Sequence, residues 1–161
     1  MSYAKFASMV VVSTFVMFGL MYLNTYGIDH LWFSQMRAWM ALLMGAAMTA
    51  IMMSFMWSMY KSAGINQSIL AASAVVFILA LWFARSQQTV DDISYMKAMI
   101  PHHSIAILTS ERAHISDPRV RKLADGIIQA QVREIREMKL LIADLEKHPI
   151  PADAQNLPPI K

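Results

Sequence analysis

Two methionines and two adjacent histidines surround a proline in the stretch MKAMIPHHS, residues 96–104. Thioether sulfur and neutral imidazole are soft or borderline metal ligands, and thioether in particular selects copper(I) over hard cations. Because thioether is not protonated in water, binding through methionine persists at mildly acidic pH, where imidazole becomes protonated. The stretch therefore indicates a candidate site for copper(I).

One face of the helix that carries this stretch gathers most of its unusual residues. At about 100° per residue, Met96, Met99 and His103 fall within roughly 40° of one line. His102 points about 80° or more away from most of them. The other members of this face are Asp92, Ser110 and His114.

A later helix carries a stripe with four-three spacing, which is typical of a surface meant for a partner helix. Gln131 and Glu134 are polar where the pattern expects apolar residues. The whole stripe consists of Val120, Ala124, Ile127, Gln131, Glu134, Met138, Leu141 and Leu145.

The two helices are predicted to form an antiparallel hairpin that turns at Ser116-Asp117. Residues whose numbers sum to about 234 then lie at the same height. The expected pairs are Met96 with Met138, Met99 with Glu134 or Ile135, and His103 with Gln131. We therefore predict one metal site built from both helices. The residues that meet there are Met96, Met99, His103 and Met138, with Asp92, Gln131 and Glu134 beside them. If a metal binds, an acid such as Asp92 or Glu134 would orient His103 through its other ring nitrogen.

The same pattern also has explanations without a metal. A methionine stripe at helical spacing is usually a packing feature, and buried polar side chains often bond one another. Pro101 removes a backbone donor and bends the helix, which either re-aims His102 and His103 or only serves packing.

A di-iron site is a further alternative, because Glu111 and His114 have the Glu-x-x-His spacing of carboxylate-bridged centres. The hairpin register opposes it, since it separates His114 from Glu134 by roughly 20 Å. No nucleophile–base arrangement, phosphate-binding glycine loop or catalytic carboxylate pair is found elsewhere, so we do not expect an enzyme or an organic cofactor.

Charge divides the chain into two halves. Of its 161 residues 57% are hydrophobic and only 16% are charged, whereas soluble domains carry about 25% charged residues. The only charged residues before Arg85 are Lys5, Asp29, Arg37 and Lys61. This asymmetry predicts a membrane half followed by an aqueous half. The net charge of +3 is small and its basic residues are interleaved with acids, which argues against nucleic-acid binding.

Three apolar segments reach the roughly 20 residues that a transmembrane helix needs. They cover about residues 6–23, 39–59 and 65–83, within a membrane domain of residues 1–84. The first lacks a small-residue cleavage site and is expected to be retained. The basic residues do not decide the orientation, because Lys5 and Lys61 oppose Arg37 and Arg85 two against two.

The aqueous half is predicted as a helical hairpin over residues 85–148. Its first helix either continues the third membrane helix or starts anew near Thr89, and it ends near Ile115 at the Ser116-Asp117-Pro118 turn. The second helix runs from Pro118 to about Lys147, and residues 149–161 form a proline-rich tail. Two helices bury little core, so we expect a homo-oligomer that completes a four-helix bundle.

Methionine recurs every four residues in the second apolar segment. The set is Met36, Met40, Met44, Met48, Met52 and Met56. Together with the three spans it loosely resembles eukaryotic copper-uptake transporters, although the usual Gly-x-x-x-Gly of their third helix is absent. Each step drifts by about 40°, so the ladder spirals around the helix.

The aqueous half resembles a bacterial family known as domain of unknown function 305, a family of CopM-like proteins with ferritin-like helical folds. The resemblance covers about residues 91–145 and is carried by Asp92, MKAMIPHH at 96–103, AI at 106–107, LA at 123–124, II at 127–128, Gln131 and EIREM at 134–138. It implies copper or silver binding outside the cytoplasm, through Met96, Met99, His102, His103 and Met138, without an established catalytic activity. It also favours a cytoplasmic N-terminus and a periplasmic hairpin at the bacterial inner membrane.

The predicted function is therefore membrane-anchored binding of copper(I), or of silver(I), in metal homeostasis or resistance. Membrane lipid, further copies of the chain and other metal-handling proteins are the expected partners. Two alternatives stay open: a metal-free membrane adaptor whose hairpin docks partner proteins, and a methionine-lined copper conduit through the membrane.

Overall fold

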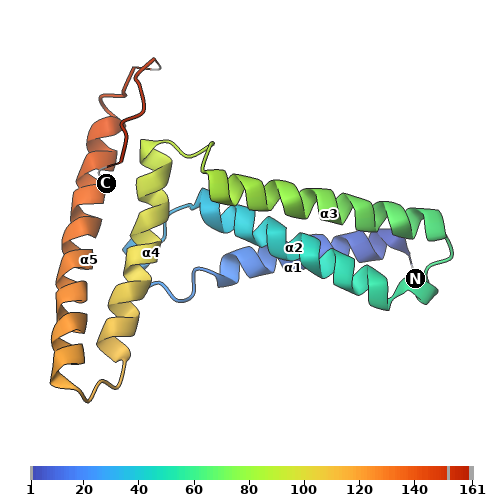
Figure 1. The fold of residues 1–161 in the computed structure, drawn as a ribbon, viewed down its shortest axis with the longest axis horizontal. Helices are drawn as coiled ribbons and strands as arrows, with labels where there is room; N and C mark the ends of the chain where they lie inside the picture. Colours follow the sequence, from blue (N-terminus) through green and yellow to red (C-terminus); the bar gives the residue numbers. More distant parts are fainter. Residues whose placement is uncertain (1, 152, 160–161) are drawn as a thin grey trace.

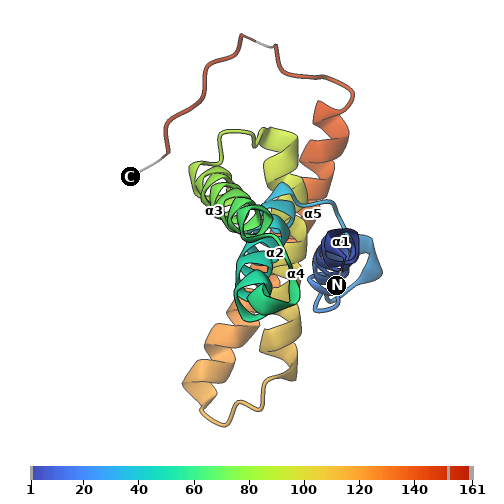
Figure 2. The same ribbon diagram turned by 90° about the vertical axis from the view of Figure 1, so that its right-hand side faces the viewer.

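The computed structural model describes residues 2–151 and 153–159, and over these residues the chain is all-α (Figure 1). The helices are α1 (Tyr3–Leu20), α2 (Gln35–Phe55), α3 (Ala63–Ser86), α4 (Asp92–Arg112) and α5 (Pro118–Leu145), with 3-10 turns η1 (Ile28–His30) and η2 (Trp57–Met59). The predicted fold class is confirmed, because three long apolar helices precede a helical hairpin. Figures 1 and 2 show the hairpin standing crosswise at one end of the three apolar helices.

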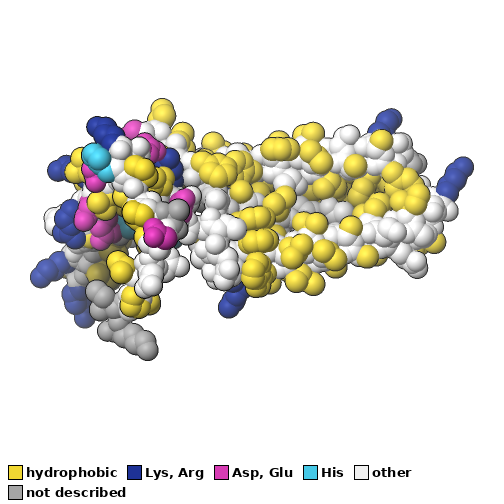
Figure 3. Space-filling model, turned by 90° about the horizontal axis from the view of Figure 1, so that it is seen from above, with side chains coloured by type: hydrophobic (Ala, Val, Ile, Leu, Met, Phe, Trp, Pro, Cys, Tyr) yellow, Lys and Arg dark blue, Asp and Glu magenta, His cyan; other side chains and the backbone are white. Residues whose placement is uncertain are grey.

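The helices α1, α2 and α3 are long and apolar enough to cross a membrane, with mean hydropathies of 1.6, 1.7 and 2.1. Each begins a few residues before the predicted span, because a serine caps its N-terminus. Ser2, Ser34 and Ser62 accept hydrogen bonds from the first-turn amides of their helices. Figure 3 shows most charged side chains gathered at the hairpin end of the molecule. The three long apolar helices and most of the charged side chains therefore lie in different parts of the molecule.

The third apolar helix and the hairpin are separate helices. Gln87 ends α3 in the left-handed region at φ 53°, and the Asp91 carboxylate accepts a hydrogen bond from the Ser94 amide at 2.7 Å to start α4. This bond holds the pKa of Asp91 below its ordinary value. Thr89, considered as the cap, instead donates from its hydroxyl to Gln35 Oε1 at 3.2 Å. Of the two possibilities that the sequence left open, the structure has the break.

The hairpin is held by an apolar core between α4 and α5. Asp117 caps α5 and Pro118 is its first residue, as the turn motif predicts. The helix α4 ends at Arg112, three residues before the predicted Ile115. The buried core consists of Met96, Ile100, Ile107, Ile135, Met138 and Ile142.

Residues 149–151 and 153–159 form no helix or strand. Residues 152, 160 and 161 of the predicted tail lie outside the described residues.

Candidate metal centre

A cavity of about 440 Å³ opens between α4 and α5. Its lining brings together six of the eight predicted site residues: Asp92, Met96, Met99, His103, Glu134 and Met138. Tyr95, Glu137, Leu141 and Leu145 complete the wall. Sequence elements about thirty residues apart thus meet at one place.

The methionines serve the core and the cavity at once. Met96 and Met138 are 7% and 9% exposed and belong to the same buried cluster, as the predicted register requires. Met99 is half-buried and packs against that cluster. The packing explanation is therefore true of these side chains, and it leaves their thioethers available to the cavity that they line.

His103 is held by both of its ring nitrogens. Nδ1 lies 2.9 Å from the Met99 carbonyl oxygen, which only accepts, so Nδ1 carries a proton. Nε2 lies 2.9 Å from Glu134 Oε2. The Met99 carbonyl fixes the orientation of the ring from Nδ1, and Glu134, one of the two acids expected to orient His103, lies against Nε2. Nε2 is then the one nitrogen able to bind a metal, and Glu134 occupies it in this structure.

Glu134 pairs with His103 although Gln131 was expected at that height. Every Cα–Cβ bond of a helix tilts toward the helix N-terminus. In an antiparallel pair the two tilts converge, so His103 reaches an α5 residue one turn beyond the one directly opposite. The side chain of Glu134 is 40% exposed, which leaves it room to swing away from Nε2.

Two predicted residues lie outside the cavity wall. His102 is exposed, and its ring centroid is 6.0 Å from that of His103. Gln131 is half-buried and does not line the cavity. The direction deduced for His102 from the helical wheel thus agrees with its position, whereas the resemblance had counted it among the ligands.

The described part of the chain assembles no group of three or more His, Asp or Glu side chains that could hold a metal ion. The di-iron alternative requires such a group. The methionines of the second apolar helix are arranged differently. None of them lines the apolar cavity that lies between α1, α2 and α3.

The loop between α1 and α2, residues 21–34, contacts both hairpin helices at positions next to the candidate ligands. Ser104, which follows His103 and is fully buried, accepts a hydrogen bond from the Tyr26 amide at 2.8 Å. The same hydroxyl lies 2.9 Å from His30 Nδ1. Lys139, which follows Met138, donates to Asp29 at 2.6 Å. The sequence pattern did not predict this junction, because its partners lie far apart in the chain and form no periodic pattern.

Acidification is expected to loosen this junction. Burial lowers the pKa of His30 below its ordinary 6.5, with Asp29 opposing and Lys139 adding to the shift. The hydrogen bond from Lys139 lowers the pKa of Asp29 below 3.8. A group with a depressed pKa stabilises the fold above its ordinary value and loses that contribution as the pH falls, so His30 acts first, below about pH 6.5.

We therefore expect the Tyr26 amide to exchange its hydrogen faster at about pH 5.5 than at about pH 7.5, after correction for intrinsic rates. Replacement of His30 by glutamine should abolish this difference in exchange rate between the two pH values. An equal change in exchange rate in the His30→Gln variant would show that another titratable group controls the junction.

Comparison with known proteins places the similarity in the C-terminal part of the chain. Residues 86–158 match the family described as "Domain of unknown function (DUF305)", which confirms the resemblance. An uncharacterized protein, L153, of Acanthamoeba polyphaga mimivirus is 37% identical over 81 residues, which make up 49% of this chain and 53% of that protein. The chain therefore spans about half the length of this curated relative. No solved structure matches the 161-residue chain.

Proposed function

We propose that this protein is a membrane-anchored binder of copper(I), with silver(I) as a second cargo, in metal homeostasis or resistance. The observation that carries the proposal is the convergence of Met96, Met99, Met138 and His103 on one cavity. Three thioethers and one imidazole form a soft donor set that suits a monovalent d¹⁰ cation and disfavours hard divalent ions.

Binding at this site has a defined sequence of events in the protein. Glu134 leaves Nε2 of His103, and that nitrogen loses any proton it holds before it can donate a lone pair. The Met99 carbonyl keeps the ring in place throughout, because its bond uses the other nitrogen. Asp92 and Glu137 lie on the cavity wall, where their negative charge favours entry of a cation.

The location proposed for the site is the periplasmic face of a bacterial inner membrane, with the N-terminus in the cytoplasm. The loop 21–34 contacts Ser104 in the middle of α4, so this loop and the hairpin lie on the same side of the three apolar helices. A fusion reporter that is active only in the periplasm, attached after residue 161, tests this orientation.

A titration of the purified full-length protein is the direct test of the function. We expect about one copper(I) per chain, displaced by silver(I) and unaffected by excess zinc(II), because thioethers discriminate against the harder ion. Competition by zinc at equal concentration, or the absence of copper(I) binding, would overturn the proposal.

A second copy of the chain is proposed to cover the cavity. The helix α4 covers only part of the apolar surface of α5. Ala124, Ile135 and Ile142 are buried, whereas an adjacent strip of apolar side chains stays exposed. Within the strip Val120 is 49% exposed, Leu123 65%, Ile127 36% and Leu141 46%. Leu141 belongs both to this strip and to the cavity wall. A partner helix on the strip would therefore close the copper site.

Replacement of Leu123 by glutamate is expected to convert an oligomer into monomers, because it places a charge within the proposed apolar interface. Leu140, 67% exposed and on another side of α5, provides the matched control, and Leu140→Glu should leave the mass unchanged. Light scattering of both variants in detergent measures the effect. An unchanged mass for Leu123→Glu would instead assign the strip to a different protein, as in a metal-free adaptor.

A further inference from the structure

Two consecutive residues of the loop 21–34 link the two helices that supply the candidate copper ligands. His30 Nδ1 lies 2.9 Å from the hydroxyl of Ser104 on α4. Its neighbour Asp29 accepts a hydrogen bond from Lys139 on α5 at 2.6 Å. The Asp29 carboxylate also lies 3.6 Å from the other ring nitrogen of His30, so the two contacts belong to one connected group.

The anchor residues Ser104 and Lys139 are neighbours of candidate ligands in the sequence. Ser104 directly follows His103 on α4, and Lys139 directly follows Met138 on α5. Because successive residues of a helix are about 100° apart, His103 and Met138 line the cavity while the anchor residues contact the loop. The loop contacts and a metal ion held between His103 and Met138 therefore depend on the same distance, that between α4 and α5.

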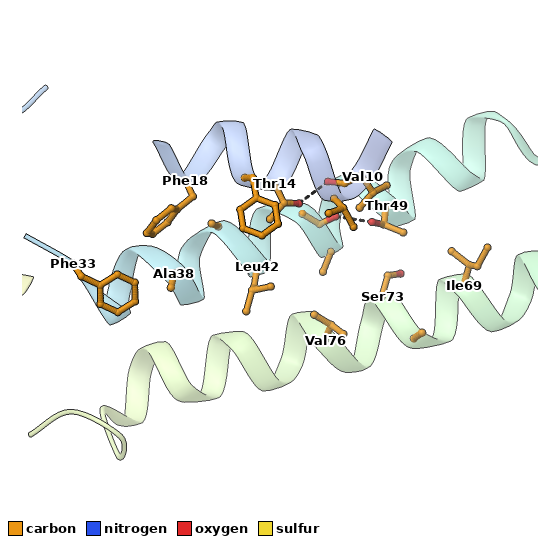
Figure 4. A pocket seen from close by; sticks show the side chains of 16 residues that line it. Val10, Thr14, Phe18, Phe33, Ala38, Leu42, Thr49, Ile69, Ser73 and Val76 are labelled. Atoms are coloured by element: carbon orange, nitrogen blue, oxygen red, sulfur yellow. Dashed lines mark hydrogen bonds between the residues drawn. The ribbon is translucent and has the colours of Figure 1, made fainter. Parts of the chain in front are cut away.

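The loop is itself fixed on the apolar helices. Figure 4 shows Phe33 beside Phe18 of α1, and their ring centroids are 6.2 Å apart. The Ser34 amide donates to the Tyr22 hydroxyl at 3.0 Å, which ties the end of the loop to its beginning. A loop that is held in this way can fix the distance between the two helices that it contacts, whereas a free loop would follow them.

Trp32 adds a packing contact from the same loop. Its side chain packs against the buried cluster that contains Met96 and Met138. Its Nε1 donates to the carbonyl oxygen of Asp29 at 3.1 Å. The residue that pairs with Lys139 is thus bonded to a side chain that packs on the cluster of the candidate thioether ligands.

We propose that Asp29 and His30 are positioning residues for copper(I), which hold α4 and α5 at the spacing that brings the ligands of both helices to one cavity. This inference rests on the proposed function, because it concerns the same site. Neither residue lines the cavity, so each acts through the helix that it contacts. Ligands that are already in place bind more tightly, since less conformational freedom is lost on binding.

The opposite charges of Asp29 and Lys139 separate this role from a simple effect of charge. If the pair holds the helices, the loss of either partner lowers the affinity for copper(I). If Asp29 only attracted the cation, Asp29→Asn would lower the affinity, but Lys139→Gln would raise it, because that substitution removes a positive charge beside the site.

The affinity of the full-length protein in detergent is measured by competition with a chromophoric copper(I) chelator. We expect a loss of about threefold to fivefold for Asp29→Asn and for Lys139→Gln, the size that a partly exposed ion pair supports. Adding His30→Ala to Asp29→Asn should extend the loss to about tenfold, since both links to the hairpin are then removed. The charge-reversed variant, Asp29→Lys with Lys139→Asp, should regain native affinity.

Asp125→Asn is the matched control, because Asp125 pairs with Arg121 within α5 at 2.7 Å and joins no two helices. This variant should bind copper(I) as the native protein does. A higher affinity in Lys139→Gln, a charge-reversed variant that stays weak, or native affinity in all variants would overturn this inference alone. If the native protein binds no copper(I), the proposed function fails and this inference fails with it.

Discussion

Replacing Met96, Met99 and Met138 together with leucine is expected to lower the affinity for copper(I) at least about 100-fold, or roughly 2.7 kcal/mol. The three side chains supply the sulfur donors of the cavity between α4 and α5. Leucine retains the apolar volume and removes the sulfur, so the substitution separates ligation from packing. Competition with a chromophoric copper(I) chelator measures the affinity.

Leucine is a sharper choice than alanine at these positions. Met96 and Met138 are almost fully buried, and truncation to alanine would cost about 2–5 kcal/mol in the core and confuse unfolding with loss of a ligand. A volume-conserving exchange usually costs less than about 1.5 kcal/mol. The triple variant should therefore keep its helical spectrum while it loses copper.

Met53 provides the matched control, because it is fully buried but lies in the apolar half. The Met53→Leu variant should bind copper(I) as tightly as the native protein. If the triple variant also keeps native affinity, the methionines are packing residues only and the proposed function fails.

Most of the residues that line this cavity could be predicted from the sequence by local rules. Helical periodicity placed Met96, Met99 and His103 on one face, and the Asp117-Pro118 turn set the hairpin register that puts Met96 and Met138 in one cluster. Helical periodicity gives the angular position of a side chain around the helix but not its tilt along the helix axis. The Cβ tilt selects Glu134 for His103 instead of Gln131.

The contacts between the two halves could not be predicted in the same way. Asp29 and Lys139 are 110 residues apart, and Tyr26 and Ser104 are 78 apart. A single polar contact produces no periodic pattern in the sequence, and its formation depends on how α4 packs against the loop. The end of α3 was ambiguous for a related reason, because the left-handed position is filled by Gln87 where glycine is the usual marker.

Replacement of Ser104 by valine is expected to cost about 1–3 kcal/mol and to release loop 21–34 from the hairpin. Valine offers no oxygen, and it also adds a methyl group at a fully buried position, so overpacking adds to the cost of the lost hydrogen bonds. The Tyr26 amide, which donates to Ser104 Oγ at 2.8 Å, is then left without this partner at a partly buried contact. His30 Nδ1 loses the same contact.

The effect should appear as faster hydrogen exchange across residues 21–34 and as a lower midpoint of thermal unfolding. Ser110→Val, on the same helix, is the control and should leave both readings near native. Because Ser104 directly follows His103, the exchange rates should also be compared with and without copper(I). If binding protects the loop in the native protein and fails to do so in Ser104→Val, the buried hydroxyl links occupancy of the candidate metal centre to the loop between the apolar helices α1 and α2. Unchanged protection in Ser104→Val would mean that the ion pair of Asp29 with Lys139 holds the loop without it.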